Sequence, residues 1–274
     1  MNSTDLSFAS HANAFERSLS IDAVRALAPA AFAASAHERT SAKYTFIPTE
    51  RVLTGLMDAG FVPVEARQTH ARRSSPAHAR HVLRLRRRFE TVQLKGSVPE
   101  VVFLNSHDGS SAYQLRMGLF RVVCTNGLIV SRGAFPAYCV PHRGRNVVDE
   151  VVTGALKLSE NFERLAAQVE RMEQRHLFKD EQLRFAERAL ALRYPDPEEA
   201  RMQPPQLLNC RRVEDTSDDL FTVLNRCQEA LLRGGLCRRA ASGRLRRTRR
   251  ITSIKEEIRL NSGLWDLATE VLAA

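Results

Sequence analysis

One stretch constrains the fold more than any other part of the chain, the segment Val101 to Ser131 with the sequence VVFLNSHDGSSAYQLRMGLFRVVCTNGLIVS. It opens with the apolar run Val101 to Leu104, continues with turn-forming residues, and then alternates apolar and other side chains from Tyr113 to Leu119. This pattern predicts a buried strand, a turn and a returning strand. The pair Asn126-Gly127 lies between two apolar triplets and favours a tight hairpin turn. The segment therefore predicts three consecutive antiparallel strands.

A helical interpretation of the end of this segment stays open. Leu119, Phe120, Val123 and Cys124 also fit one face of a helix, with Gly127 just beyond its end. We prefer the strands, because Asn-Gly is the pair that favours a type I′ hairpin.

Composition and charge bound the class of protein. The chain has 274 residues, of which 43% are hydrophobic and 26% charged, as in ordinary globular proteins of one large or two modest domains. No apolar run is long enough to span a bilayer, and the N-terminus lacks a basic region followed by an apolar core, so we expect a cytoplasmic protein without a membrane partner. The net charge of +10 favours polyanionic partners, of which nucleic acid is the first to consider.

The five cysteines are odd in number and form no C-x-x-C pair, which argues against a disulfide framework and against a zinc finger. The sequence also contains no Walker, dinucleotide-binding or zincin motif. We therefore expect reduced thiols, no cofactor and no bound metal.

Short elements are expected before the central segment. A helix is predicted from Ile21 to Leu27, capped by the preceding serine, and a second follows Pro48-Thr49-Glu50 and ends before Gly60. Strands are predicted from Phe61 to Ala66 and from His81 to Phe89.

After Val147 the apolar period changes from two to about three and a half residues. The spacing predicts one long helix from Asn146 to Leu192, ended by the breaker Pro195-Asp196-Pro197. Its apolar seam consists of Val151, Ala155, Leu158, Phe162, Leu165, Val169, Met172 and His176. We prefer to interpret the seam as a core face, and the alternative is self-association into a homo-oligomer.

Four prolines between residues 195 and 206 indicate a linker. We therefore expect an α+β core domain over residues 1–194, in which an antiparallel sheet packs against the long helix. A small helical region is expected over residues 207–274, with helices from Asp215 to Arg233 and from about Ser253 onward.

The first of two arginine clusters surrounds the predicted strand at His81. Its members are Arg72, Arg73, Arg80, Arg84, Arg86, Arg87 and Arg88. On a strand, Arg84, Arg86 and Arg88 share one face, and guanidinium groups about 6 to 7 Å apart match successive phosphates. We predict that these three contact a nucleic-acid backbone, and the alternative is a solvated basic face.

The second cluster is the segment Arg238 to Arg250, RRAASGRLRRTRR, with seven arginines and no acid. We expect a mobile loop that orders on a polyanion, with Arg244, Arg246, Arg247 and Arg249 contacting phosphates. A flexible solvated insertion is the alternative. Neither cluster is interleaved with aromatic residues, so binding through phosphates, without base readout, is predicted.

The turn Asn105 to Ser111 invites an enzymatic interpretation. His107 and Asp108 are candidate metal ligands, and the serines are candidate nucleophiles. Adjacent residues alone supply neither three convergent ligands nor an oriented base. Hydrogen bonds from Asn105, Asp108 and Ser110 that stabilise the turn are the preferred interpretation, and a non-catalytic protein is favoured.

The segment Asn105 to Val130 resembles the signature of a widespread bacterial family of phage- and plasmid-associated proteins, classed as a domain of unknown function. The segments Phe46 to Gln68, Arg211 to Gly235 and Arg259 to Leu272 resemble further motifs of that family. The matching signature positions include Asn105, His107, Asp108, Gly109, Cys124, Asn126 and Gly127.

The chain also departs from the family, in which Trp is common at the position of Phe221 and Asn at that of Ala230. The resemblance implies mobile elements, a bacterial cytoplasm and DNA transactions. The order of a helix, strands and a long helix is similar, at the level of fold only, to single-strand annealing recombinases such as Red-beta and RecT.

Charge and resemblance together predict a non-catalytic DNA-binding protein of mobile-element origin, active in recombination or replication. The main alternative is an interaction protein acting on host machinery through the heptad seam or the helix of Trp265. A metal-dependent nuclease centred on His107 and Asp108 is the third hypothesis.

Overall fold

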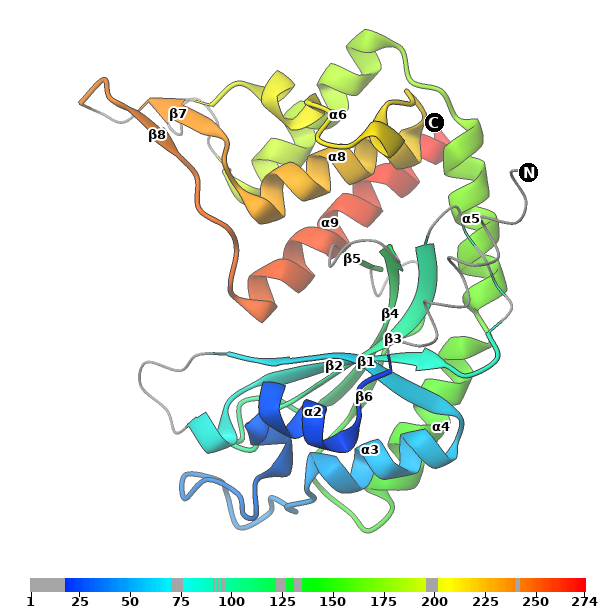
Figure 1. Cartoon of the computed structure of the whole chain (residues 1–274), viewed down its shortest axis with the longest axis vertical. Coiled ribbons are helices and arrows are strands. Elements are labelled where there is room, and N and C mark those ends of the chain that lie inside the picture. Colours follow the sequence, from blue (N-terminus) through cyan, green and yellow to red (C-terminus); the bar gives the residue numbers. More distant parts are fainter. Residues whose placement is uncertain are drawn as a thin grey trace, which may run out of the picture. The chain divides into compact units, whose positions relative to one another are not determined.

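A computed structural model describes residues 18–69, 76–90, 92, 94, 97–121, 127–130, 135–195, 202–239 and 242–274 (Figure 1). Contacts within the chain divide it into two compact units. Unit 1 comprises Met1–Thr125 and Pro136–Phe162, and unit 2 comprises Asn126–Phe135 and Glu163–Ala274. The boundary between the compact units therefore precedes the proline-rich stretch, and the predicted domain limits stay a prediction.

Unit 1 is built on an antiparallel sheet with the strand order β1-β2-β3-β4, and β6 pairs with β4. Its strands are β1 (Phe61–Gln68), β2 (His81–Arg87), β3 (Ser97–Asn105), β4 (Tyr113–Arg121) and β6 (Tyr138–Val140). The four longer strands confirm the predicted strands, and the predicted α+β class is confirmed with them. The turn at Asn126 lies outside the described residues, which resume at Gly127 with β5 (Gly127–Ile129) of unit 2.

Three helices of unit 1 pack beside this sheet (Figure 1). They are α2 (Ile21–Leu27), α3 (Thr49–Asp58) and α4 (Val147–Ser159). The predicted cap of α2 is confirmed, because Ser20 Oγ accepts a hydrogen bond of 3.1 Å from the Ala23 N–H. Helices α3 and α4 approach closely at Gly55, where a Cβ atom would lie 2.9 Å from Val148 Cγ1.

The single long helix predicted from Asn146 to Leu192 is wrong. The structure has three helices there, α4, α5 (Phe162–Gln174) and α6 (Lys179–Arg193). The first break follows Ser159, where Asn161 donates its side-chain N–H to the Lys157 carbonyl over 2.9 Å. At the second, the Leu177 N–H donates to the Asp218 carbonyl over 2.9 Å, so the backbone bonds another segment instead of its own helix. Periodicity alone does not reveal these competing hydrogen bonds.

The seam residues of α4 and α5 are nevertheless buried within the single chain. Val151, Ala155, Leu158, Phe162, Leu165, Val169 and Met172 are at most 1% exposed. The eighth predicted member, His176, lies beyond the end of α5 and is exposed. This burial supports a core face over a self-association surface.

Unit 2 is mainly helical. It contains most of α5, together with α6, α8 (Leu220–Arg233), α9 (Ile254–Ala273), β5, β7 (Cys237–Arg239) and β8 (Leu245–Arg247). Helix α8 packs against α6 and α9, and every residue from Leu220 to Leu232 is buried. Trp265 of α9 is fully buried, with its ring 6.1 Å from that of Phe135. The predicted helical C-terminal region is confirmed.

In the described part of the chain, short 3-10 helices connect these elements: η1 (Pro29–Phe32), η2 (Pro76–His78), η3 (Pro204–Leu208) and η4 (Val213–Asp215). Within the described ranges, no helix has both the length and the apolar character that crossing a membrane requires.

Candidate functional site

Two of the three predicted phosphate-binding arginines of β2 are buried and ion-paired. Arg84 Nε lies 2.7 Å from Glu100 Oε2, and Arg84 Nη1 lies 2.5 Å from Glu65 Oε2. Arg86 Nη2 lies 2.6 Å from Glu100 Oε1. Arg84 and Arg86 are 8% and 5% exposed, and Glu100 is fully buried. The expected exposed row of guanidinium groups is therefore wrong for Arg84 and Arg86, because β2 is an inner strand and acids on both neighbouring strands neutralise them.

Arg88 follows β2 and is exposed, so it alone of the three remains accessible to a phosphate. Its backbone N–H donates to the Gly60 carbonyl over 2.7 Å. Arg72 and Arg73 of the same cluster lie outside the described residues. Arg87, the last residue of β2, is also exposed, and its Nη1 donates to Ser159 Oγ over 3.2 Å. Burial thus removes Arg84 and Arg86 from the basic surface but leaves Arg87 and Arg88 on it.

The second cluster forms a two-stranded antiparallel ribbon rather than the expected mobile loop. Cys237 pairs with Arg247, Arg238 with Arg246, and Arg239 with Leu245. All six strand residues are exposed. Because side chains alternate along a strand, Arg238 and Arg246 occupy one face, and Arg239 and Arg247 occupy the other. We call the segment Cys237–Thr248 the arginine ribbon.

Hydrogen bonds at its base hold the arginine ribbon on unit 2. Gln206 Oε1 accepts a hydrogen bond of 2.7 Å from the Cys237 N–H, and Gln206 Nε2 donates one of 3.0 Å to the Cys237 carbonyl. The Thr248 N–H donates to the Leu236 carbonyl over 2.9 Å, and the Gly235 N–H donates to the Thr248 carbonyl over the same distance. These bonds account for the departure from the predicted loop, since composition does not reveal them.

The ribbon starts at the end of α8, where Gly234 has a conformation suited to glycine. Its φ is +73° and its ψ is −150°. A Cβ atom there would lie 2.7 Å from the carbonyl oxygens of Thr248 and Arg249. The returning strand therefore approaches α8 too closely for any other residue.

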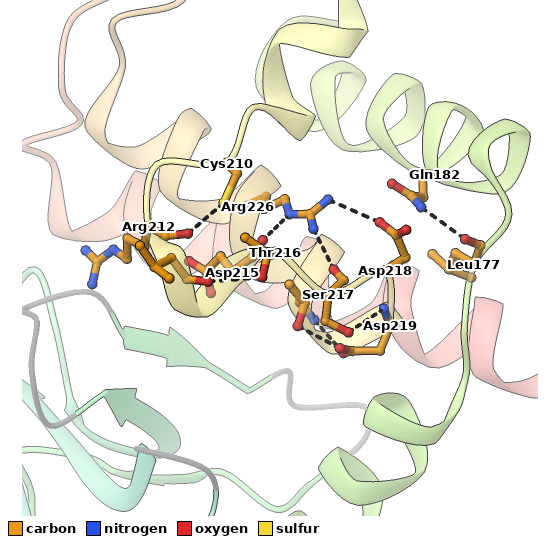
Figure 2. Close-up of polar contacts among 12 residues, drawn as sticks. Leu177, Gln182, Cys210, Arg212, Asp215, Thr216, Ser217, Asp218, Asp219 and Arg226 are labelled. Atoms are coloured by element: carbon orange, nitrogen blue, oxygen red, sulfur yellow. Dashed lines mark hydrogen bonds and ion pairs between the residues drawn. The ribbon is translucent and has the colours of Figure 1, made fainter.

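Other arginines of unit 2 form hydrogen bonds within that unit. Figure 2 shows Arg226 of α8 reaching back to the segment before the helix. Its Nε donates to the Asp215 carbonyl over 2.6 Å, and its Nη2 donates to the Ser217 carbonyl over 2.5 Å. Asp219 caps α8 by accepting the Thr222 N–H over 2.8 Å. Arg212 and Glu229 form a two-fold hydrogen-bonded pair, at 3.0 and 3.1 Å. Both arginines therefore stabilise the helix that supports the ribbon.

The ribbon and the segment just after it differ from this interior set. Within the described ranges, no side-chain hydrogen bond or ion pair engages their guanidinium groups, which are those of Arg238, Arg239, Arg244, Arg246, Arg247, Arg249 and Arg250. All seven are exposed. They are the largest group of uncompensated positive charge that the described sequence places in one segment.

A second candidate site is a buried polar network in unit 1. Thr49 Oγ1 lies 2.9 Å from His81 Nε2 and 3.2 Å from His107 Nε2, and it accepts the Asn105 amide N–H over 2.9 Å. Asn105 Oδ1 lies 2.8 Å from His142 Nε2. The register of β2 and β3 places His81 opposite Asn105, so two adjacent strand ends and the start of α3 build the network.

The network determines which nitrogen of each histidine carries a proton. His81 Nδ1 lies 3.0 Å from the Ala79 carbonyl, which only accepts, so Nδ1 is protonated and Nε2 accepts from Thr49. With its one hydrogen used, Thr49 must accept from His107 Nε2. Asn105 Oδ1 likewise accepts from His142 Nε2. The ring of His81 is therefore neutral, because its Nε2 must carry a lone pair. For His107 and His142 the hydrogen bonds require only that Nε2 is protonated.

Burial favours the neutral form of all three histidines, because it lowers their pKa values. It lowers the pKa of His81 and of His142 to about 4. The pKa of His107 falls to about 3, again mainly through burial, with repulsion from His81 and His142 adding to it. Because the three rings are hydrogen-bonded to the buried side chains of Thr49 and Asn105, we favour a structural role for the network.

The turn after β3 contains the stabilising hydrogen bonds predicted for Asp108 and Ser110. Asp108 Oδ1 accepts from Ser106 Oγ over 2.7 Å and from the Ser110 N–H over 2.9 Å. Partial burial raises the pKa of Asp108, but the hydrogen bonds from Ser110 and Ser106 outweigh it and bring the pKa below its usual value. Gly109 has a φ of +77°, which suits a tight turn. Asn105 differs from the expectation, because its side chain enters the buried network instead.

Of the other signature positions, Cys124 and Asn126 lie outside the described residues, and Gly127 is the first residue of β5. In the described part of the chain, no group of three or more potential metal ligands comes together. Sequence reasoning missed the roles of Thr49 and His81. The sequence signal was a polar residue at the start of a predicted helix, Thr49, and another at the start of a predicted strand, His81, which is too common to be diagnostic.

A pocket of about 610 Å³ in unit 1 shares His142 with the network. Three loops line it, with Arg39, Thr40, Ser41 and Tyr44 from the first, Asp108, Gly109, Ser111 and Ala112 from the second, and Pro141, His142 and Arg143 from the third. The turn with the family signature thus forms one wall of the pocket.

The family model for the domain of unknown function DUF932 matches residues 36–265. Two relatives from Escherichia coli strain K12, the UPF0380 proteins YafZ and YfjQ, are each 38% identical to this chain over 259 residues. Each match covers 94% of this chain and 93% of the relative. No solved structure matches the chain significantly. These matches confirm the resemblance to a bacterial family classed as a domain of unknown function.

Proposed function

We propose that this chain, which belongs to the DUF932 family of domains of unknown function, binds nucleic acid through its phosphate backbone by means of the arginine ribbon. One observation carries the proposal: within the described residues the exposed arginines of the ribbon have no acidic partner, whereas Arg84, Arg86, Arg212 and Arg226 are all compensated. The hydrogen bonds at its base hold the strands that carry these arginines in place on unit 2.

The shape of the ribbon supports the same proposal. Two antiparallel strands form an element narrow enough to enter the major groove of B-form DNA, which is about 12 Å wide. Arg238 and Arg246 on one face and Arg239 and Arg247 on the other allow phosphates on both sides to be contacted at once. Binding of this kind releases counterions and is independent of base sequence.

DNA is the nucleic acid that we propose, in a bacterial cytoplasm and in recombination or replication of mobile elements. This finer statement rests on the context implied by the family signature and on the net charge of +10. A role without catalysis fits the candidate metal ligands His107 and Asp108. His107 is hydrogen-bonded to Thr49, and Asp108 accepts hydrogen bonds from Ser106 Oγ and the Ser110 N–H.

Replacing both cross-strand arginines tests the proposal. In the variant Arg238→Gln/Arg246→Gln, affinity for a labelled DNA duplex at low salt should fall by on the order of a hundredfold, because each lost phosphate contact costs about tenfold. Fluorescence anisotropy measures the affinity. The matched control is Arg171→Gln/Lys179→Gln, which removes the same charge from exposed positions of α5 and α6.

The control variant should keep most of its affinity. If the two variants lose affinity equally, overall charge rather than the ribbon is responsible, and the ribbon is not the binding surface.

A further inference from the structure

The pocket of unit 1 has the size of a small-molecule site. Its volume of about 610 Å³ lies within the range of roughly 300 to 1,000 Å³ that ligand pockets occupy. It is separate from the arginine ribbon, which belongs to unit 2.

Hydrogen bonds between its loops keep the walls of the pocket in place. The His37 N–H donates to the His107 carbonyl over 2.9 Å, and the Thr45 N–H donates to the His142 carbonyl over 2.8 Å. The ring of Tyr44 stacks on that of His142, with centroids 4.4 Å apart and planes 18° apart. The buried network then fixes His142 through Asn105. The pocket is therefore formed before any ligand arrives.

Its lining combines two cations with one carboxylate. Arg39 and Arg143 are exposed, and among the described residues neither guanidinium group has a hydrogen-bond or ion-pair partner. Among the described residues that line the pocket, Asp108 is the only acid. Its Oδ1 is used by Ser106 and Ser110, which leaves Oδ2 able to accept from a ligand.

We propose that this pocket binds a nucleoside monophosphate unit. Arg39 and Arg143 pair with the phosphate, since guanidinium groups match phosphate oxygens in geometry and charge. Asp108 Oδ2 accepts from a sugar hydroxyl or a base amino group. An inorganic anion alone would leave that carboxylate facing like charge, so the ligand carries both an anion and a hydrogen-bond donor.

The unit can be a free nucleotide or the 5′-phosphorylated end of a strand, which share this chemistry. Calorimetric titration of the full chain with adenosine monophosphate, with inorganic phosphate, and with a short oligonucleotide bearing or lacking a 5′-phosphate separates these sources. We expect saturable one-to-one binding of the free nucleotide or of the 5′-phosphorylated oligonucleotide, and at least tenfold weaker binding of inorganic phosphate.

The variant Arg39→Gln/Arg143→Gln should weaken that binding by about tenfold or more. The control Arg51→Gln/Lys157→Gln removes the same charge from exposed positions of α3 and α4 and should not. Absence of binding of adenosine monophosphate together with equal binding of the two oligonucleotides, or equal binding by the two variants, would overturn the proposal.

Titration of the ribbon variant Arg238→Gln/Arg246→Gln keeps the two proposals distinguishable. This variant should bind the nucleotide as the parent does, because its substitutions lie in unit 2. Loss of nucleotide binding there would place the site on the ribbon and overturn the assignment to the pocket.

Discussion

Thr49 is the residue on which the polar interior of unit 1 converges. It is fully buried, and it has one hydrogen to donate and two lone pairs to receive. Donation to His81 and acceptance from Asn105 and His107 use all three capacities. A proton added to His81 would remove the acceptor that Thr49 needs. The hydrogen bonds of Thr49 are therefore matched to a neutral His81.

This match predicts how stability depends on pH. The folded pKa values of His81, His107 and His142 lie below the unfolded value of about 6.5, so the unfolded chain binds more protons below that pH. The stabilisation is fully present above about pH 6.5 and is lost as pH falls toward about 4. Each histidine contributes a slope of up to about 1.4 kcal/mol per pH unit.

Chemical denaturation at pH 7, 6 and 5 measures this slope, and histidine NMR signals identify the groups. Three of the eight histidine signals should stay unchanged down to about pH 5. Titration of all eight between pH 6 and 7 is incompatible with the buried network.

At the scale of elements, the arginine ribbon depends on its junction with α8. The helix is buried along its length, and Gly234 brings the returning strand against its end. The side chains of Gln206 and Arg211 complete the junction, with Arg211 Nη2 donating to the Gly234 carbonyl over 2.8 Å. The ribbon is thus presented on the helix that Arg226 and Arg212 hold in place.

The substitution Gly234→Ala should destabilise unit 2 by about 2 to 4 kcal/mol, because it combines a strained conformation with a clash against backbone atoms. Gly243→Ala is the matched control, since Gly243 also has a positive φ, of +77°, but its Cβ would meet nothing within 4 Å. It should cost only about 1 kcal/mol. Urea denaturation of the two variants compares them, and equal losses would mean that the close approach does not matter.

Local patterns predicted the strands at Val101 and Tyr113 and the helices at Ile21 and Leu220, because burial and capping act over a few residues. Local patterns failed to predict the structure where residues far away in the sequence form the hydrogen bonds or ion pairs that decide it. The break between α5 and α6 depends on Asp218, more than forty residues away in sequence, and the ribbon depends on Gln206. The burial of Arg84 depends on Glu65 and Glu100 of its neighbouring strands, which one strand's alternation cannot reveal.

At the scale of the whole molecule, chemistry is divided between two compact units. Unit 1 carries a buried polar network that shares His142 with a pocket, and among the described residues two arginines of that pocket have no partner. Unit 2 carries the exposed ribbon, which accounts for much of the excess positive charge. In our account, backbone binding belongs to unit 2 and recognition of a single nucleotide unit belongs to unit 1.

The salt dependence of DNA binding tests the central claim most directly. For labelled single- and double-stranded DNA, the logarithm of the association constant of the parent chain should fall linearly with the logarithm of the salt concentration. On a duplex the slope should be about −0.9 for each phosphate contacted. If the ribbon is the interface, the slope for Arg238→Gln/Arg246→Gln should be smaller in magnitude by about 2. No binding by the parent at low salt, or the same slope for both proteins, would contradict the account.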